Sequence, residues 1–164
     1  MIFVTVGAQM AFDRLIRAVD DWALRRQRDD VFAQIGPSEL KTRQIATTRF
    51  IDPQEFRRRV SEARIVIAHA GMGSIITALE LGKPILVMPR RGDLRETRND
   101  HQVATARQFE RSGRIATAMD EAELMDKLDT LDTLDAMSGA APVPPQASPQ
   151  LIAAVRGFLD AQIK

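Results

Sequence analysis

The sequence predicts an α/β fold with a single, doubly wound parallel sheet of the Rossmann-like kind. Short apolar runs alternate with longer stretches in which apolar residues recur at helical spacing. Within residues 65–89, an apolar run ends in a glycine-rich loop, the loop opens into a helix, and a second apolar run follows. A strand, a crossover helix and a second strand in this order predict two parallel neighbours in one sheet. A length of 164 residues fits one domain, or one domain with a tail.

The first half of the chain predicts three strands and two helices. Apolar residues from Phe12 to Ala23 recur at the spacing of an amphipathic helix. Asp52 precedes Pro53 as an N-cap precedes a proline at the first helical position, which predicts a short helix to about Ala63. The strands are expected at 2–6, 31–35 and, more weakly, 45–51.

The second half places the glycine loop between two core strands, at 65–68 and 85–88. A helix is expected over 99–112 and a short strand at 115–117. Residues 120–123 resemble a capping box and predict a helix to about residue 134.

The composition then divides the chain into a domain at 1–137, a linker at 138–149 and a C-terminal amphipathic helix at 150–164. The linker is rich in proline, serine and alanine. Apolar residues of the last segment form one stripe, which is expected to pack on the domain or on a partner. The stripe consists of Leu151, Ile152, Val155, Phe158, Leu159 and Ile163.

The composition excludes several classes of protein. The 23 basic and 22 acidic residues give a net charge of +1, which offers no electrostatic case for a nucleic-acid partner. The absence of cysteine excludes disulfides, and with two histidines we expect no metal site. No apolar run is long enough for a membrane span, and residues 1–7 lack the charged start of a signal peptide.

The glycine loop predicts a ligand with a phosphate or diphosphate. Amide N–H groups at a helix N-terminus attract an anion. Gly71 and Gly73 allow the backbone to approach a ligand closely. Ser74 can either cap the helix or offer its hydroxyl to a phosphate.

Four motifs in order resemble the C-terminal, donor-binding domain of GT-B glycosyltransferases of family 28. More closely, the chain is similar to the small soluble subunit of two-component glycosyltransferases that build exopolysaccharides or dolichol-linked N-acetylglucosamine. The resemblance covers about residues 1–110. The motifs are Val4–Gly7 with Phe12–Ile16, His69–Ile75, Gly82–Pro84, and Asn99–Gln102.

The resemblance implies that the chain is one half of a GT-B fold and binds a UDP-sugar as substrate, with no other cofactor. The diphosphate would lie at Gly71, Gly73 and Ser74, and the sugar near His101 and Gln102. Thr77 stands where many relatives carry an acidic residue for the ribose. The implied substrate-binding residues are Gly7, Ala8, Gln9, His69, Gly71, Met72, Gly73, Ser74, Thr77, Arg90, His101 and Gln102.

Several of these residues also have a purely structural interpretation. His69 fits a structural histidine that holds the loop better than it fits a general base. His101 and Gln102 would equally suit a solvated helix face. Arg90 begins an arginine-rich loop that would bind a diphosphate, an acidic sugar or a partner, or would simply be solvated.

The other half of a GT-B enzyme, with the acceptor site and the usual base, is expected on a second polypeptide. In similar systems this partner is membrane-associated and recruits the small subunit to the cytoplasmic face, so we expect a cytoplasmic protein. No catalytic residue is assigned on this chain. The alternatives are a non-catalytic nucleotide-sugar-binding module, a dinucleotide enzyme and a scaffold. The dinucleotide enzyme is disfavoured because Gly7-Ala8-Gln9 is not a G-x-G-x-x-G motif.

Overall fold

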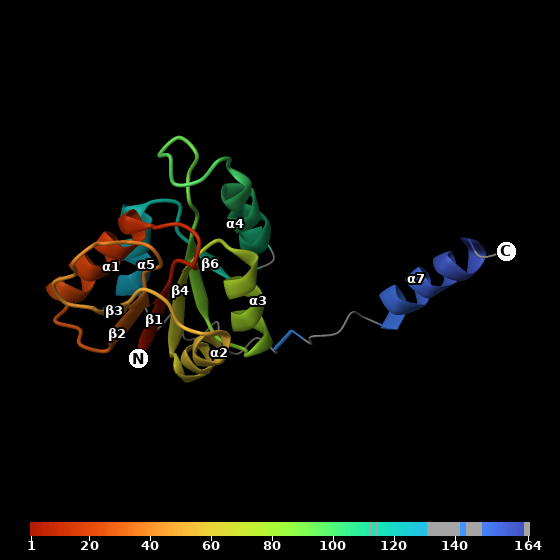
Figure 1. The fold of residues 1–164 in the computed structure, drawn as a ribbon, viewed down its shortest axis with the longest axis horizontal. Coiled ribbons are helices and arrows are strands. Elements are labelled where there is room, and N and C mark those ends of the chain that lie inside the picture. Colours follow the sequence, from red (N-terminus) through yellow and green to blue (C-terminus); the bar gives the residue numbers. More distant parts are fainter. Residues whose placement is uncertain (112, 114, 131–141, 144–148, 163–164) are drawn as a thin grey trace.

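The computed structural model describes residues 1–111, 113, 115–130, 142–143 and 149–162, and it contains one six-stranded sheet (Figure 1). The strand order is β3-β2-β1-β4-β5-β6, and all neighbours are parallel. The predicted α/β fold with a single parallel sheet is confirmed. The strands are β1 (Ile2–Thr5), β2 (Val31–Gln34), β3 (Ala46–Thr48), β4 (Ile65–His69), β5 (Ile85–Met88) and β6 (Ala116–Thr117).

Helices cover both faces of the sheet, as a doubly wound fold requires (Figure 1). The helices are α1 (Asp13–Arg25), α2 (Pro53–Glu62), α3 (Met72–Glu80), α4 (His101–Arg111), α5 (Glu121–Asp129) and α7 (Pro149–Gln162). Along β4, Ile65 and Ile67 join the core under α1 and α5, whereas Val66 and Ala68 join the core under α2, α3 and α4. This alternation explains why the strand is apolar throughout.

The sheet reverses its strand order between β1 and β4. The chain adds β2 and β3 on one side of β1 and then crosses to the other side to form β4, β5 and β6. In open parallel sheets, ligands bind in the crevice outside the carboxyl ends of the strands at such a reversal. Here β1 ends at Thr5 and β4 ends at His69.

Two predicted helix starts are confirmed. The Asp52 carboxylate accepts the Glu55 N–H at 2.8 Å, with Pro53 as the first helical residue of α2. The Asp120 carboxylate accepts the Glu123 N–H at 2.9 Å at the start of α5.

Two predicted elements are shorter than expected. The third strand, expected at 45–51, is limited to Ala46–Thr48 of β3. The chain turns toward the Asp52 cap of α2, which leaves Phe50 and Ile51 in a loop. Helix α5 ends at Asp129 with Thr130 as its C-cap, and the expected extension over 131–134 lies outside the described residues.

The predicted linker lies mostly outside the described residues. Within it, the Val143 N–H donates to the Leu79 carbonyl at 3.1 Å, at the C-terminal end of α3. Helix α7 follows and lies apart from the sheet (Figure 1). Its described apolar side chains, Leu151, Ile152 and Val155, are about half exposed, so the stripe is not fully buried at these positions. In the described part of the chain, no helix has the length and apolar character needed to cross a membrane.

Candidate functional site

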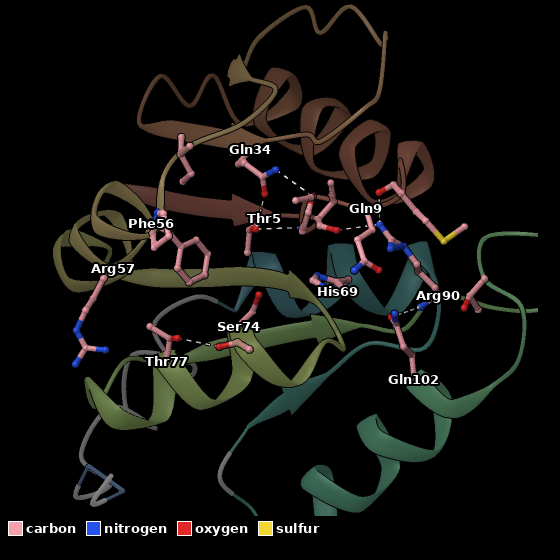
Figure 2. Close-up of a pocket in the computed structure, with 18 of the residues that line it drawn as sticks. Thr5, Gln9, Gln34, Phe56, Arg57, His69, Ser74, Thr77, Arg90 and Gln102 are labelled. Atoms are coloured by element: carbon pink, nitrogen blue, oxygen red, sulfur yellow. Dashed lines mark hydrogen bonds between the residues drawn. The ribbon is translucent and has the colours of Figure 1, made fainter.

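A cavity of about 820 Å³ lies at the carboxyl edge of the sheet, at the ends of β1 and β4 (Figure 2). Most of the residues predicted from the sequence line it, although they come from four separate segments. Gly71 and Met72 are the exceptions, and the Met72 side chain is 47% exposed. The predicted residues in the lining are Gly7, Ala8, Gln9, His69, Gly73, Ser74, Thr77, Arg90, His101 and Gln102.

The N-terminus of α3 presents free amides at this cavity. Gly71 is the N-cap, and the Ile75 N–H makes the first helical hydrogen bond, to the Gly71 carbonyl at 3.2 Å. The Gly71 N–H is already donated to the His69 carbonyl at 2.8 Å. The amides of the first turn, Met72 to Ser74, make no hydrogen bond to the described residues, as expected at a helix start. These amides and the helix dipole together suit an anion.

Ser74 is not the helix cap, so that alternative is wrong. It is the third residue of α3, is 6% exposed and makes no capping hydrogen bond, because Gly71 occupies the cap position. Its side chain lies beside the cavity (Figure 2). The hydroxyl is therefore available to a ligand.

Thr77 and Glu80 differ in their relation to the cavity. The Thr77 hydroxyl lines the cavity but donates its proton to the Gly73 carbonyl at 2.8 Å, so it can offer a ligand only an acceptor. Glu80 does not line the cavity and instead forms an ion pair with Arg57 at 3.1 Å. Arg57 does line the cavity, and the sequence reasoning did not identify it.

His69 fills the space between the two glycine loops. A Cβ on Gly71 would lie 2.1 Å from His69 Nε2, and a Cβ on Gly7 would lie 3.0 Å from His69 Cε1. Gly7 also has a φ of +74°, which favours glycine. Both loops therefore need glycine at the position where they meet the imidazole ring.

The imidazole of His69 is neutral at neutral pH. Burial lowers the pKa of His69 to about 4, and the positive charge of Arg90 adds to this effect, while the Thr5 backbone opposes it. The Nδ1 atom is buried without a hydrogen-bond partner among the described residues. Within the described part of the chain no carboxylate is hydrogen-bonded to the ring as it would be in a general base, and the packing between two loops agrees with a structural role.

Arg90 is a buried cation with no carboxylate partner in the described part of the chain. It is 4% exposed, and its Nη2 donates to the carbonyls of Val6 at 2.9 Å and Met10 at 2.6 Å. Its Nε is buried and unpaired. Burial lowers the pKa of Arg90, and the charge of Glu96 opposes this effect. A positive charge without a counter-ion at the cavity wall favours an anionic ligand.

Gln102 and His101 begin α4 and have different environments. Gln102 is 7% exposed, and its side-chain oxygen accepts the Arg90 backbone N–H at 3.2 Å, which leaves its NH₂ group for a ligand. A solvated face is therefore the wrong interpretation for Gln102. His101 is exposed, and its ring contacts the Asn99 side chain.

The sequence reasoning missed an apolar wall and a polar floor of the cavity. Figure 2 shows Phe56 and Arg57 at one end and Arg90 and Gln102 at the other, with His69 and Ser74 between them. The floor contains Gln34, which accepts the Thr5 hydroxyl proton at 2.8 Å and donates to the Gly7 carbonyl at 3.0 Å. A signal for it was present, because polar residues interrupt two apolar strands at their carboxyl ends. The wall consists of Ile51, Pro53 and Phe56.

The cavity can bind a molecule with a flat apolar part, a negatively charged middle and a polar end. No aspartate or glutamate is among the described residues that line it, so this lining offers no carboxylate as a base. Among the described residues, no group of three or more potential ligands is arranged to hold a metal ion.

Comparison with known proteins identifies the family. The profile of the glycosyltransferase family 28 C-terminal domain matches residues 1–142. The chain belongs to this family. It is 30% identical over 124 residues to the human UDP-N-acetylglucosamine transferase subunit ALG13. The aligned segment covers 70% of this chain but only 10% of the human protein. The chain therefore spans about a tenth of the length of this relative.

Solved structures share the fold. A nuclear magnetic resonance structure of ALG13 matches with a TM-score of 0.60 at 19% identity, over 91% of each chain. The crystal structure of the kitacinnamycin glycosyltransferase matches with a TM-score of 0.61 at 16% identity, over 84% of this chain and 37% of the other. The second match agrees with a chain that forms one half of a GT-B fold.

Proposed function

We propose that this chain is the donor-binding subunit of a two-component, inverting glycosyltransferase that transfers a sugar from a UDP-sugar to a lipid-linked acceptor in glycan or exopolysaccharide biosynthesis. The observation that carries the proposal is the pairing of free amides at the start of α3 with the buried Arg90, at one cavity whose described lining contains no carboxylate. Such a site favours a diphosphate over a neutral ligand.

The residues that line the cavity support an arrangement of the donor along it. The base would lie on the wall near Phe56, the diphosphate at the first turn of α3, and the sugar at the end with Arg90 and Gln102. The name of the human relative makes UDP-N-acetylglucosamine the first donor to test.

The chain's part in catalysis is to stabilise the leaving group. As the bond from the sugar to the diphosphate breaks, negative charge grows on the departing UDP. The amides from Met72 to Ser74 and the dipole of α3 would stabilise this charge in place. The acceptor hydroxyl would attack the sugar from the opposite face, and a base on the partner would remove its proton.

The partner is expected to dock on the carboxyl edge of the sheet. Three loops at this edge and the first residue of α3 each expose one large apolar side chain. Leu24, near the end of α1, lies at the opposite edge. Apolar side chains around an open site are typical of an interface. The four are Met10, Phe50, Met72 and Leu94, with exposures of 39%, 53%, 47% and 47%. Such a partner, membrane-associated, would hold this subunit at the cytoplasmic face.

Calorimetric titration of the isolated chain with UDP, ADP and NAD tests the donor site. We expect saturable binding of UDP that Gly73→Val abolishes. A Cβ on Gly73 meets no atom within 4 Å, so the added side chain would fill the ligand's space without disturbing the fold. Ala122→Val is the matched control, because Ala122 is the second residue of α5 as Gly73 is the second residue of α3. Equal UDP binding by both variants would contradict the proposal.

A transfer assay separates the enzyme subunit from a non-catalytic binding module. With the acceptor-binding partner co-expressed, we expect sugar transfer that neither chain performs alone and that Gly73→Val abolishes. UDP-sugar binding without transfer in the assembled complex would support the binding module instead.

A further inference from the structure

The loop that carries the sugar end of the cavity contains no helix or strand. Residues 89–100 connect β5 to α4, and they bring Arg90 and Thr97 to the cavity ahead of His101 and Gln102. A loop of this length needs specific contacts to hold one shape. The Asp100 carboxylate accepts the Gly92 N–H at 2.8 Å, and a second carboxylate, Glu96, ties the loop to the rest of the domain.

Glu96 forms a paired ion bridge with Arg14 of α1. Arg14 Nε donates to one Glu96 oxygen at 2.7 Å, and Arg14 Nη2 donates to the other at 2.8 Å. The second oxygen also accepts the Arg91 N–H at 3.0 Å. The two side chains are only 14% and 13% exposed. A bidentate, largely buried pair of this kind has a fixed geometry.

Arg14 holds the loop at both of its anchor points. Its Nη2 also donates to the Pro89 carbonyl at 3.2 Å, where the loop begins. Its Nη1 donates to Glu121 of α5 at 3.1 Å. Burial lowers the pKa of Arg14, but Glu96 and then Glu121 outweigh this effect and raise it. The guanidinium therefore joins α1, α5 and the two ends of the segment from Pro89 to Glu96.

Phe12 extends the connection to the glycine loop on the other side of the cavity. The guanidinium carbons of Arg14 and Arg90 lie 5.3 and 5.1 Å from the centre of the Phe12 ring. Arg90 in turn holds the carbonyls of Val6 and Met10, which bracket Gly7–Gln9. These contacts fix two loops at the polar end to each other. Of the residues that make the contacts, Arg90, Val6 and Met10 line the cavity, whereas Phe12, Arg14 and Glu96 do not.

We propose that Arg14 and Glu96 are a positioning pair, which sets the β5–α4 loop so that Thr97, Arg90 and Gln102 can bind the sugar of the donor. The inference rests on the proposed function. Neither residue of the pair lines the cavity, and both act through the loop. In the described structure neither residue of the pair has a hydrogen bond or ion pair with α2 or α3, and Arg90 keeps its own hydrogen bonds to the Val6 and Met10 carbonyls. We therefore expect UDP binding to depend little on this pair. Sugar recognition is therefore adjustable separately from nucleotide recognition.

The test compares UDP with UDP-sugars in calorimetric titrations of the full chain. In the wild type we expect UDP-N-acetylglucosamine, UDP-glucose or UDP-glucuronic acid to bind more tightly than UDP. Glu96→Gln keeps the size of the side chain and removes its charge. It should weaken the preferred UDP-sugar by about tenfold, the loss of one or two hydrogen bonds to the sugar, while UDP affinity stays within about twofold. Arg14→Lys, which cannot make the bidentate pair, should give a smaller loss of the same kind.

Glu121→Gln is the matched control, because Glu121 also pairs with Arg14 but does not contact the loop, and its side chain is 45% exposed. It should leave both affinities unchanged. Hydrogen exchange of the 91–97 amides should quicken in Glu96→Gln but not in Glu121→Gln, and the quickening should be confined to this loop, which a purely global loss of stability would not produce.

Three results would overturn the inference. In the first, Glu96→Gln weakens the affinities for UDP and for the UDP-sugar equally. In the second, it changes neither affinity. In the third, the wild type binds every UDP-sugar with the same affinity as UDP. A wild type that does not bind UDP would instead refute the proposed function itself, so the two failures are distinguishable.

Discussion

The neutral, partly buried His69 makes the stability of the fold depend on pH in a defined window. Its pKa is about 4 in the folded protein, against 6.5 for an unperturbed histidine. Between these two values the unfolded chain binds a proton that the folded chain does not bind. Stability is therefore fully present above pH 6.5 and falls as the pH is lowered toward 4.

The size of the effect follows from the two pKa values. Each pH unit between them contributes about 1.4 kcal/mol, so the loss relative to pH 7 should be about 2 kcal/mol at pH 5 and about 3 kcal/mol at pH 4. Carboxylates with a lowered pKa, such as Asp20 and Asp30, change the stability of the fold only at still lower pH, because the usual pKa of an aspartate is already 3.8. The window from pH 6.5 to 5 therefore reports mainly on His69.

Urea denaturation of the wild type and of His69→Asn at pH 7, 6 and 5 measures this contribution. Asparagine does not titrate in this range. Between pH 7 and pH 5, the free energy of unfolding of His69→Asn should therefore fall by about 2 kcal/mol less than that of the wild type. The comparison uses the pH dependence, so a constant cost of the substitution cancels. Parallel curves for the two proteins would refute the assignment of a buried, neutral imidazole.

Three further substitutions probe other contacts. Gly71→Ala should lower the melting temperature and the affinity for UDP, because the new Cβ would lie 2.1 Å from His69 Nε2; calorimetry measures both, and unchanged values would contradict the packing. Asp20→Asn should cost about 2 kcal/mol in urea denaturation, because the Asp20 carboxylate accepts the N–H groups of Arg43, Gln44 and Ile45; a loss below about 0.5 kcal/mol would contradict this. Leu94→Asp should weaken pull-down of the co-expressed partner and leave UDP binding intact, whereas Leu24→Asp should affect neither; equal effects would remove the carboxyl edge as the interface.

The fold could be predicted because its signals are local. The alternation in β4 and the Asp52-Pro53 start of α2 each depend on residues close together in the sequence. The glycine loop also predicted the position of the cavity, since a parallel sheet places the ends of neighbouring strands at one edge. The third strand was overestimated because the apolar Phe50 and Ile51 resemble a strand, although the cap at Asp52 decides where the chain turns.

The missed parts of the site depend on contacts between distant residues. Glu96 and Arg14 are 82 positions apart, and no local pattern joins them. Gln34 reaches the Gly7 carbonyl only because β2 pairs with β1 in register. The role of Ser74 as a cap was wrong because the helix begins at Met72, three positions earlier than a Ser74 cap requires.

The most direct test of the central claim is a nuclear magnetic resonance titration of the ¹⁵N-labelled chain with UDP. The account predicts saturable shifts of the Met72, Gly73 and Ser74 amides, with little change at Leu24 on the far edge. Binding that shifts other amides and leaves these three unchanged would contradict the assignment of the diphosphate to the start of α3.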